Sequence, residues 1–262
     1  MIRAEGLAKR YGEIVALESV DLDVKKNEIF GVLGSNGAGK STLLKILAGL
    51  SRPTSGRGSV GGHDVVDDGL AAKRITGFLP EFPTLPEKLT GWELMQLLAQ
   101  LREMPDEEAT KRVSRLARRL DLAELDRLIG TYSKGMRQKL SLIAALFHQP
   151  QVLLMDEPTS GLDPRLSRVV KDVVGQARET ATVLVATHSS HLAEQICDRI
   201  AILDQGSIVA IGSVPELLSR TGAKDVEEAF IRTVEGIGEP AGGSAPVLEA
   251  NGGHAERESA HR

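Results

Sequence analysis

Residues 34–41 decide the fold, and they read Gly34-Ser35-Asn36-Gly37-Ala38-Gly39-Lys40-Ser41. An apolar run at 28–33 precedes them, and leucines and isoleucines at helical spacing follow at 43–47. A strand, a glycine-rich loop and a helix in this order predict a phosphate-binding loop, in which backbone N–H groups meet phosphate oxygens at a helix N-terminus. Lys40 would then reach the β and γ phosphates, and the Ser41 hydroxyl would bind Mg²⁺.

The composition indicates a globular chain and excludes several functional classes. Of 262 residues, 41% are hydrophobic and 26% charged, which allows one core, or one core with an inserted lobe. A formal charge of −4 and 3% aromatic residues argue against a nucleic-acid partner. The one cysteine, Cys197, excludes an internal disulfide framework and a cysteine-based zinc site.

The sequence contains no segment expected to enter or cross a membrane. No uncharged apolar run approaches the ~18 residues needed to span a bilayer, and residues 1–5 lack the apolar stretch of a secretory signal. Sparing use of cysteine fits a reducing compartment. We therefore expect a cytoplasmic chain.

The remaining apolar runs predict an α/β fold with a mixed sheet. Strict alternation at 20–24 is typical of a half-buried antiparallel strand at an edge. The runs at 151–155 and 182–186 read as buried parallel strands, each ending in polar residues at the edge where such sheets carry chemistry. Apolar runs at 200–203 and 208–211 flank a turn and predict a hairpin.

A helical segment interrupts this pattern. Two apolar helical stripes, one beginning at Trp92 and one at Val113, indicate an α-helical lobe at about 89–150, inserted in a phosphate-loop NTPase core. The basic residues around the second stripe are interpreted as a solvated helix face. Residues 1–235 would form the domain, and the polar tail at 236–262 is expected to be disordered.

Two carboxylates and a histidine follow the predicted parallel strands. Asp156 and Glu157 come directly after the run at 151–155, and Pro158 stops that strand from continuing. Asp156 can hold Mg²⁺ through water, and Glu157 can act as the base or orient the attacking water. His188 ends the next strand, where it can contact a γ-phosphate.

Two further segments do not indicate a function by themselves, and only their position along the chain relative to the other motifs makes them informative. Residues 132–138 (Tyr-Ser-Lys-Gly-Met-Arg-Gln) and 160–163 (Ser-Gly-Leu-Asp) each fit a capped helix start. Taken together with the motifs above, the chain from about residue 1 to 235 resembles the nucleotide-binding subunit of an ATP-binding-cassette (ABC) transporter. In that resemblance, 132–138 is the signature segment, 160–163 the D-loop and His188 the switch histidine.

The resemblance implies a full set of site residues. Lys134 and Met136 depart from the most familiar signature, and this variant resembles exporter subunits with a separately encoded membrane protein, as do 197–203 and 227–230. The implied catalytic residues are Glu157, His188 and Lys40. The implied metal ligands are Ser41, Asp156 and Glu81, the last standing where the family usually has glutamine. The implied nucleotide-binding residues are Tyr11 (on adenine), Gly34, Ser35, Asn36, Gly37, Ala38, Gly39, Lys40, Ser41, Thr42, Ser133, Gly135 and Asp163.

The resemblance also implies partners and a working cycle. One phosphate loop and one signature per chain imply that ATP and Mg²⁺ are held across a homodimer, or a heterodimer with a similar subunit. The expected activity is ATP hydrolysis that powers export through a separate transmembrane permease, with this chain peripheral on the inner face of the cell membrane. The alternatives are a cassette ATPase without a membrane partner, a phosphate-loop GTPase or small-molecule kinase, and a module that binds nucleotide without turnover. The sequence has no Asn-Lys-x-Asp or Thr-Lys-x-Asp segment for guanine.

Overall fold

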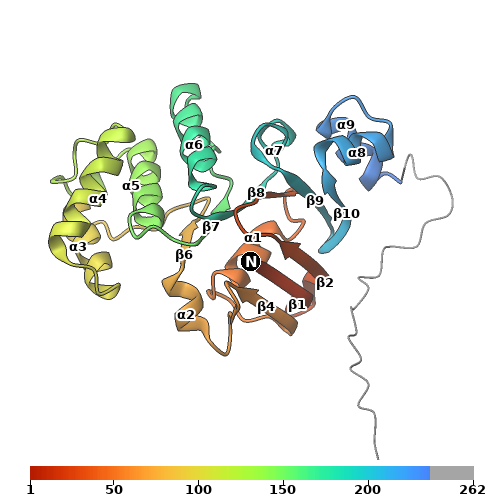
Figure 1. The fold of residues 1–262 in the computed structure, drawn as a ribbon, viewed down its shortest axis with the longest axis horizontal. Helices are drawn as coiled ribbons and strands as arrows, with labels where there is room; N and C mark the ends of the chain where they lie inside the picture. The colour runs from red at the N-terminus through yellow and green to blue at the C-terminus, as the bar shows by residue number, and fades with distance from the viewer. Residues whose placement is uncertain (237–262) are drawn as a thin grey trace, which may run out of the picture.

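The computed structural model describes residues 1–236, which form ten strands and nine α-helices (Figure 1). The predicted disordered tail lies outside this range except for Gly236. The strands are β1 (Ile2–Tyr11), β2 (Ile14–Val24), β3 (Ile29–Leu33), β4 (Ser55–Val60), β5 (His63–Asp64), β6 (Thr76–Leu79), β7 (Val152–Asp156), β8 (Thr182–Thr187), β9 (Arg199–Asp204) and β10 (Ser207–Ser213). The helices are α1 (Lys40–Leu47), α2 (Gly69–Arg74), α3 (Gly91–Leu101), α4 (Asp106–Arg119), α5 (Lys134–Leu146), α6 (Pro164–Ala177), α7 (Ser190–Ile196), α8 (Val214–Thr221) and α9 (Val226–Val234), with the 3₁₀ helix η1 (Ile129–Thr131).

The strands form two sheets, which confirms the predicted α/β class with a mixed sheet and an antiparallel edge. The larger sheet has the order β10-β9-β3-β8-β7-β6, parallel except for the β9–β10 pair. The smaller sheet, β2-β1-β4-β5, is antiparallel. The predicted hairpin is β9–β10, whose turn residues Gln205 and Gly206 both have positive φ, as a tight hairpin turn requires.

Helix α1 lies between the two sheets. Its buried Leu43 and Leu44 belong to one apolar cluster with Leu17 of β2, Leu154 of β7 and Leu184 of β8. Burial of these side chains on both sides of α1 removes apolar surface from water and fixes the helix against the larger sheet. The packing of α1 therefore also fixes the loop at 34–39, which joins the carboxyl end of β3 to α1.

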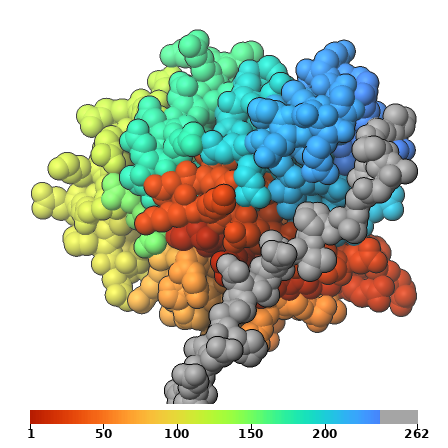
Figure 2. Space-filling view, turned by 45° about the vertical axis from the view of Figure 1, so that its right-hand side comes forward, coloured from red at the N-terminus to blue at the C-terminus, as the bar shows by residue number. Residues whose placement is uncertain are grey.

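The chain between β6 and β7 contains α3, α4, η1 and α5, which gather at one end of the molecule (Figure 1). Their buried residues, such as Met95, Val113 and Leu140, share a cluster with Leu153 of β7. The apolar stripe that begins at Trp92 was expected to run through Met95 and Leu98 to Leu101. Leu101 instead is 72% exposed, because α3 ends at this residue. In the space-filling view, α3 and α4 (yellow) and α8–α9 (blue) lie toward opposite sides, with part of the N-terminal segment (red) between them (Figure 2).

The helices of residues 1–236 are short. The longest, α4 and α6, have 14 residues each, and no helix in this range combines the length and apolar character needed to cross a membrane.

Candidate functional site

The loop at 34–39 wraps around the side chain of Lys40 at the start of α1. Lys40 is 5% exposed, and its ammonium donates hydrogen bonds of 2.9 Å to the carbonyl oxygens of Gly34 and Ser35. Gly39 has φ 108°, and a Cβ at this position would collide with the Ala16 carbonyl oxygen. Only glycine fits there, and it lets the loop turn directly into the helix.

Carboxylates surround the buried ammonium of Lys40. Burial lowers the pKa of Lys40, and the charges of Glu157, Asp156 and Glu81 act in the opposite direction. The closest of these contacts is Glu157 Oε1, 3.9 Å from Lys40 Nζ. The loop thus places backbone N–H groups and the Lys40 ammonium next to Glu157, Asp156 and Glu81. The first turn of α1 itself contains no acidic residue that would repel an anion. This arrangement suits a bound polyphosphate.

Glu157 is held by Thr187, the last residue of the neighbouring strand β8, and by His188, which follows it. β7 and β8 pair in parallel with Asp156 opposite Ala186, so Glu157 lies beside Thr187 and His188. Oε1 of Glu157 accepts a 2.8 Å bond from the His188 backbone N–H and lies 2.8 Å from His188 Nδ1, and Oε2 accepts 2.9 Å from the Thr187 hydroxyl. The Glu157 side chain is 7% exposed, whereas that of His188 is 53% exposed.

Asp156 has the properties of a Mg²⁺ ligand. Its Oδ1 is buried without a hydrogen-bond partner in the described part of the chain. Burial raises the pKa of Asp156, Glu157 raises it further, and a hydrogen bond with Ser41 lowers it. A buried oxygen with an unused lone pair, next to a hydroxyl, fits a cation that takes one or two protein oxygens and keeps several waters. Within residues 1–236, no group of three or more acidic, histidine or cysteine side chains forms a complete metal cage.

Two further predicted site residues, Glu81 and Tyr11, are more exposed than Lys40, Asp156 and Glu157. Glu81 follows β6, is half-buried, and is near enough to raise the pKa of Lys40. Tyr11 ends β1 with 48% of its surface exposed, and Lys9 Nζ lies 4.8 Å from the centroid of its ring. The tyrosine ring is available for stacking, with a cation already above it.

The signature segment and the D-loop form helix starts away from the phosphate-loop residues. Ser133 is the N-cap of α5 and its Oγ accepts 3.2 Å from the Met136 N–H. Asp163 is the N-cap of α6 and accepts 2.9 Å from the Leu166 N–H. A Cβ at Gly135 would meet nothing closer than Ser133 Oγ at 4.0 Å. No hydrogen bond or ion pair in the described chain joins Ser133 or Gly135 to Lys40 or Glu157. One chain therefore does not bring the two halves of the predicted site together.

Comparison with known families agrees with this geometry. The family described as ABC transporter matches residues 17–160, more than half of the chain. The chain belongs to the ABC transporter family.

Several ABC proteins are similar over most of their length. The daunorubicin resistance ATP-binding protein DrrA3 of Streptomyces coeruleorubidus is 40% identical over 86% of this chain and 72% of its own. The linearmycin resistance ATP-binding protein LnrL of Bacillus subtilis is 36% identical over 91% and 76%. An ATP-binding subunit of an ABC transporter superposes with a TM-score of 0.84 at 29% identity, over 89% of this chain and 99% of its own.

A second structural neighbour records an assembled state. The ABC cassette MJ0796, in a dimeric post-hydrolysis structure with ADP and Pi, superposes with a TM-score of 0.75 at 27% identity, over 81% of this chain and 98% of its own. That cassette is thus recorded as a dimer that holds the products of ATP hydrolysis.

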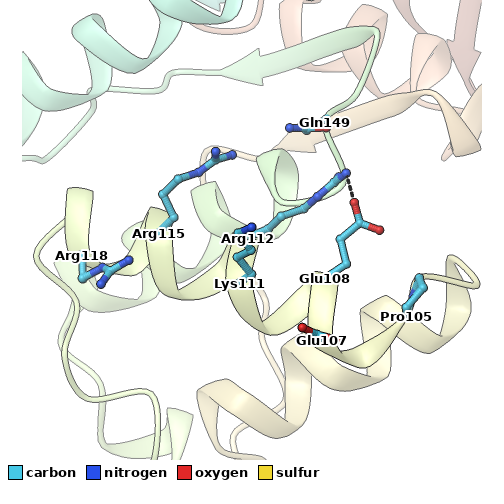
Figure 3. A pocket seen from close by; sticks show the side chains of 8 residues that line it. All are labelled: Pro105, Glu107, Glu108, Lys111, Arg112, Arg115, Arg118 and Gln149. Carbon is cyan, nitrogen blue, oxygen red and sulfur yellow. Dashed lines mark hydrogen bonds and ion pairs between the residues drawn. The ribbon is translucent and has the colours of Figure 1, made fainter.

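A separate cleft of about 530 Å³ lies along α4 of the ABC fold, away from the phosphate loop (Figure 3). Arg112 is engaged, since it pairs with Glu108 and donates 3.2 Å to the Phe147 carbonyl oxygen. Acidic residues fill the first turn of α4 and basic residues its last turn. This pattern complements the helix dipole and accounts for the charge of the cleft without a ligand.

Sequence reasoning did not single out Thr187 for this ABC site. Its side chain is 1% exposed, it donates to Glu157, and it accepts 3.0 Å from the Ser189 N–H. The available signal was a hydroxyl at the end of a buried strand, one residue before a histidine expected to touch phosphate.

Proposed function

We propose that this chain is the ATP-binding and ATP-hydrolysing subunit that powers export across a membrane through a separate transmembrane permease. The observation that carries the proposal is the Glu157 carboxylate, fixed by Thr187 and His188 at 3.9 Å from the ammonium of Lys40. A positioned base next to a phosphate loop is the arrangement that hydrolysis of a triphosphate needs. Two relatives, DrrA3 and LnrL, are resistance ATP-binding proteins, which supports export.

In this proposal, the loop and its lysine bind the triphosphate. Backbone N–H groups of 34–42 and the Lys40 ammonium neutralise phosphate charge, with Tyr11 against the adenine ring. The buried ammonium is favourable there because a phosphate replaces the carbonyl oxygens it now contacts, in a place of low dielectric. Ser41 and Asp156 would hold Mg²⁺, which would neutralise developing negative charge, and Glu81 would reach its water shell.

Glu157 would take the proton of the attacking water. His188 and Thr187 restrict the carboxylate to one orientation, and His188 is exposed enough to reach a γ-phosphate. Because a carboxylate only accepts, the proton of His188 lies on Nδ1, which leaves Nε2 for another partner.

The second half of each ATP site would come from a second cassette, in a homodimer or in a heterodimer with a similar subunit. Among residues 1–236, a Cβ at Gly135 would meet only Ser133 Oγ, at 4.0 Å, which leaves room for another molecule to approach the Ser133 hydroxyl and the first N–H groups of α5. Asp163 would fix the D-loop at that interface. Within the domain at 1–235, the helical lobe at about 89–150 would pass dimer closure to the permease, with the chain peripheral on the inner face of the membrane.

Replacement of Glu157 by glutamine tests the core of the proposal. The variant should lose ATP hydrolysis by at least about 100-fold, because an amide cannot accept the proton, and should accumulate as an ATP-bound dimer in size-exclusion chromatography. Glu194→Gln, at an exposed position of α7, is the matched control and should hydrolyse ATP normally. Unchanged turnover in Glu157→Gln would remove Glu157 as the base.

Co-purification tests the proposal that this chain works with a separate transmembrane permease. The tagged chain, expressed from its own chromosome and extracted in mild detergent, should retain a polytopic membrane protein in stoichiometric amount. An active ATPase that recovers none would favour the alternative, a cassette ATPase that drives an assembly or regulatory step.

A further inference from the structure

Gln138 carries a buried polar group that the proposed function does not use. It lies in the second turn of α5, is 6% exposed, and has no hydrogen-bond partner for Nε2 among residues 1–236. Two other buried side-chain atoms in this range share that property, Asp156 Oδ1, which suits Mg²⁺, and His148 Nδ1. An amide donor removed from water without an acceptor destabilises the state that contains it.

The Gln138 amide lies beside a narrow gap between three elements. Helix α5 contributes Gln138 and Leu142 to its wall, β6 contributes Leu79, and the chain after β7 contributes Pro158 and Leu162. In the described part of the chain, the gap has no room for a water molecule. Because water cannot serve Nε2 there, an acceptor for this donor has to come from the protein.

Two unpaired acceptors belong to the wall of the same gap. The main-chain carbonyl oxygens of Pro158 and Leu162 accept no backbone hydrogen bond from residues 1–236. Their segment, 158–163, includes the D-loop and is loosely bonded, since the Leu162 N–H donates to the Thr159 carbonyl oxygen at 3.3 Å. An unpaired donor on α5 thus borders the same gap as two carbonyl oxygens that could accept from it.

The signature segment at 132–138 and the D-loop at 160–163 touch without any polar link. A Cβ at Gly161 would collide with Lys134 Nζ, so the two segments are in contact. No hydrogen bond or ion pair among residues 1–236 joins one segment to the other. Apolar contact is non-directional, so packing alone lets the D-loop shift against α5.

We propose that Gln138 is a positioning residue, which fixes the 158–163 segment against α5 when two cassettes close around ATP. In the proposed dimer, the N-terminus of α5 and the D-loop both meet the second cassette, so they have to be held in one relative position. On closure the gap narrows, and the Gln138 amide donates to the carbonyl oxygen of Pro158 or Leu162. The bond forms within one chain and touches no nucleotide. The inference rests on the proposed dimeric function and adds an intrachain device to it.

Replacement of Gln138 by methionine is the first test, because methionine keeps the length of the side chain and removes the donor. The nucleotide-free variant loses an unpaired buried amide, so its Tm should rise by about 2–4 °C. In a Glu157→Gln background, the ATP concentration for half-maximal dimerisation should rise about tenfold. Gln176→Met, at an exposed position of α6, is the matched control and should equal its parent in both measurements.

The opposite directions of the two effects separate positioning from packing. Weaker dimerisation together with a Tm equal to or above that of the parent supports the proposal. Weaker dimerisation with a lower Tm would assign Gln138 to packing and overturn the proposal, as would an unchanged dimerisation curve. Binding of a fluorescent ADP to the monomeric chain should stay within about twofold of the parent, and a larger loss would show that Gln138 acts on the nucleotide site instead.

NMR of the side-chain amides tests the bond itself and needs no change at Gln138. In the Glu157→Gln chain labelled with ¹⁵N in its glutamine side chains, one amide proton of Gln138 should shift downfield when ATP drives dimerisation, because it enters a hydrogen bond. The exposed Gln176 amide is the internal control and should keep its position. Gln138 signals that do not move on dimerisation would refute the inference.

The outcomes for the two proposals are distinguishable. If the wild-type chain does not hydrolyse ATP and Glu157→Gln does not dimerise with it, the proposed function fails and the role of Gln138 fails with it. If both activities are present and Gln138→Met matches Gln176→Met, only the inference about Gln138 is wrong.

Discussion

Oε1 of Glu157 lies 2.8 Å from both the backbone nitrogen and the ring Nδ1 of His188. Glu157 also has φ 47°, a left-handed conformation that is uncommon for a residue with a side chain. Its N–H donates 2.8 Å to the Ala186 carbonyl oxygen, so backbone and side chain are both tied to the end of β8. Strain of this kind persists where the surroundings fix it, and it is concentrated at functional sites.

Removal of the His188 ring should impair chemistry more than binding. His188→Ala keeps the backbone bond to Oε1 of Glu157 and the Thr187 bond to Oε2, but it removes the ring that orients Oε1 and can reach a γ-phosphate. We therefore expect kcat to fall about 100-fold with a KM for ATP within about threefold. Steady-state ATPase kinetics measure both constants. His191→Ala, on an exposed position of α7, is the control. A rise in KM alone would show that His188 binds nucleotide without orienting Glu157.

Thr187 should act through Glu157. Thr187→Val keeps the shape of a buried side chain but loses the hydrogen bond to Oε2, so kcat should fall about tenfold while ATP-dependent dimerisation persists. Thr187→Ser restores the hydroxyl and should recover most of the activity. A serine variant as slow as the valine variant would point to packing as the cause.

We expect the Asp156 carboxylate to lower the stability of the nucleotide-free protein. Its carboxylate is buried, Oδ1 has no hydrogen-bond partner in the described part of the chain, and burial raises the pKa of Asp156. Asp156→Asn removes the charge and should stabilise the nucleotide-free chain by about 1 kcal/mol, or 2–4 °C in Tm, while ATP hydrolysis falls at least about 100-fold. Differential scanning calorimetry measures the Tm shift.

The raised pKa of Asp156 also determines how the stability difference between Asp156→Asn and the wild type changes with pH. The folded state binds the Asp156 proton more tightly than the unfolded state, so the cost is present at neutral pH and disappears as pH falls through the raised pKa. The Tm difference between Asp156→Asn and wild type should therefore narrow in acid. Asp172→Asn, at an exposed position of α6, should show no such difference at any pH.

His148 should make the fold sensitive to acid. Burial, with the nearby positive charges of Arg102 and Arg112, lowers its pKa from 6.5 to about 4. Between these values the unfolded chain holds a proton that the folded chain lacks, so the free energy of unfolding falls as pH falls, by up to about 3 kcal/mol in total. His148→Gln keeps a donor for the Thr76 carbonyl oxygen and should flatten this slope in urea titrations from pH 7 to 4.

His63→Gln is the control for the acid prediction, since it replaces a half-buried histidine of β5 that pairs with Asp68. In this variant, the free energy of unfolding should still fall steeply between pH 6.5 and 4, as in the wild type. An unchanged slope in His148→Gln would show that acid lability comes from other groups.

The sequence by itself determined the local elements. The glycine spacing at 34–39 requires a loop between a strand and a helix, because positive φ at Gly37 and Gly39 is accessible to few other residues. Alternation at 20–24 predicted an antiparallel strand, and two apolar runs predicted the β9–β10 hairpin. These patterns are readable because each depends on neighbours within a few residues of the chain.

Only the tertiary structure decided which distant side chains meet. β8 pairs with both β3 and β7, and this order brings His188 to Glu157, 31 residues earlier. The same packing leaves Asp156 Oδ1 without a hydrogen-bond partner among residues 1–236 and lays Lys134 over Gly161. Strand order and helix packing are set by burial of apolar surface over the whole domain, which no local pattern records.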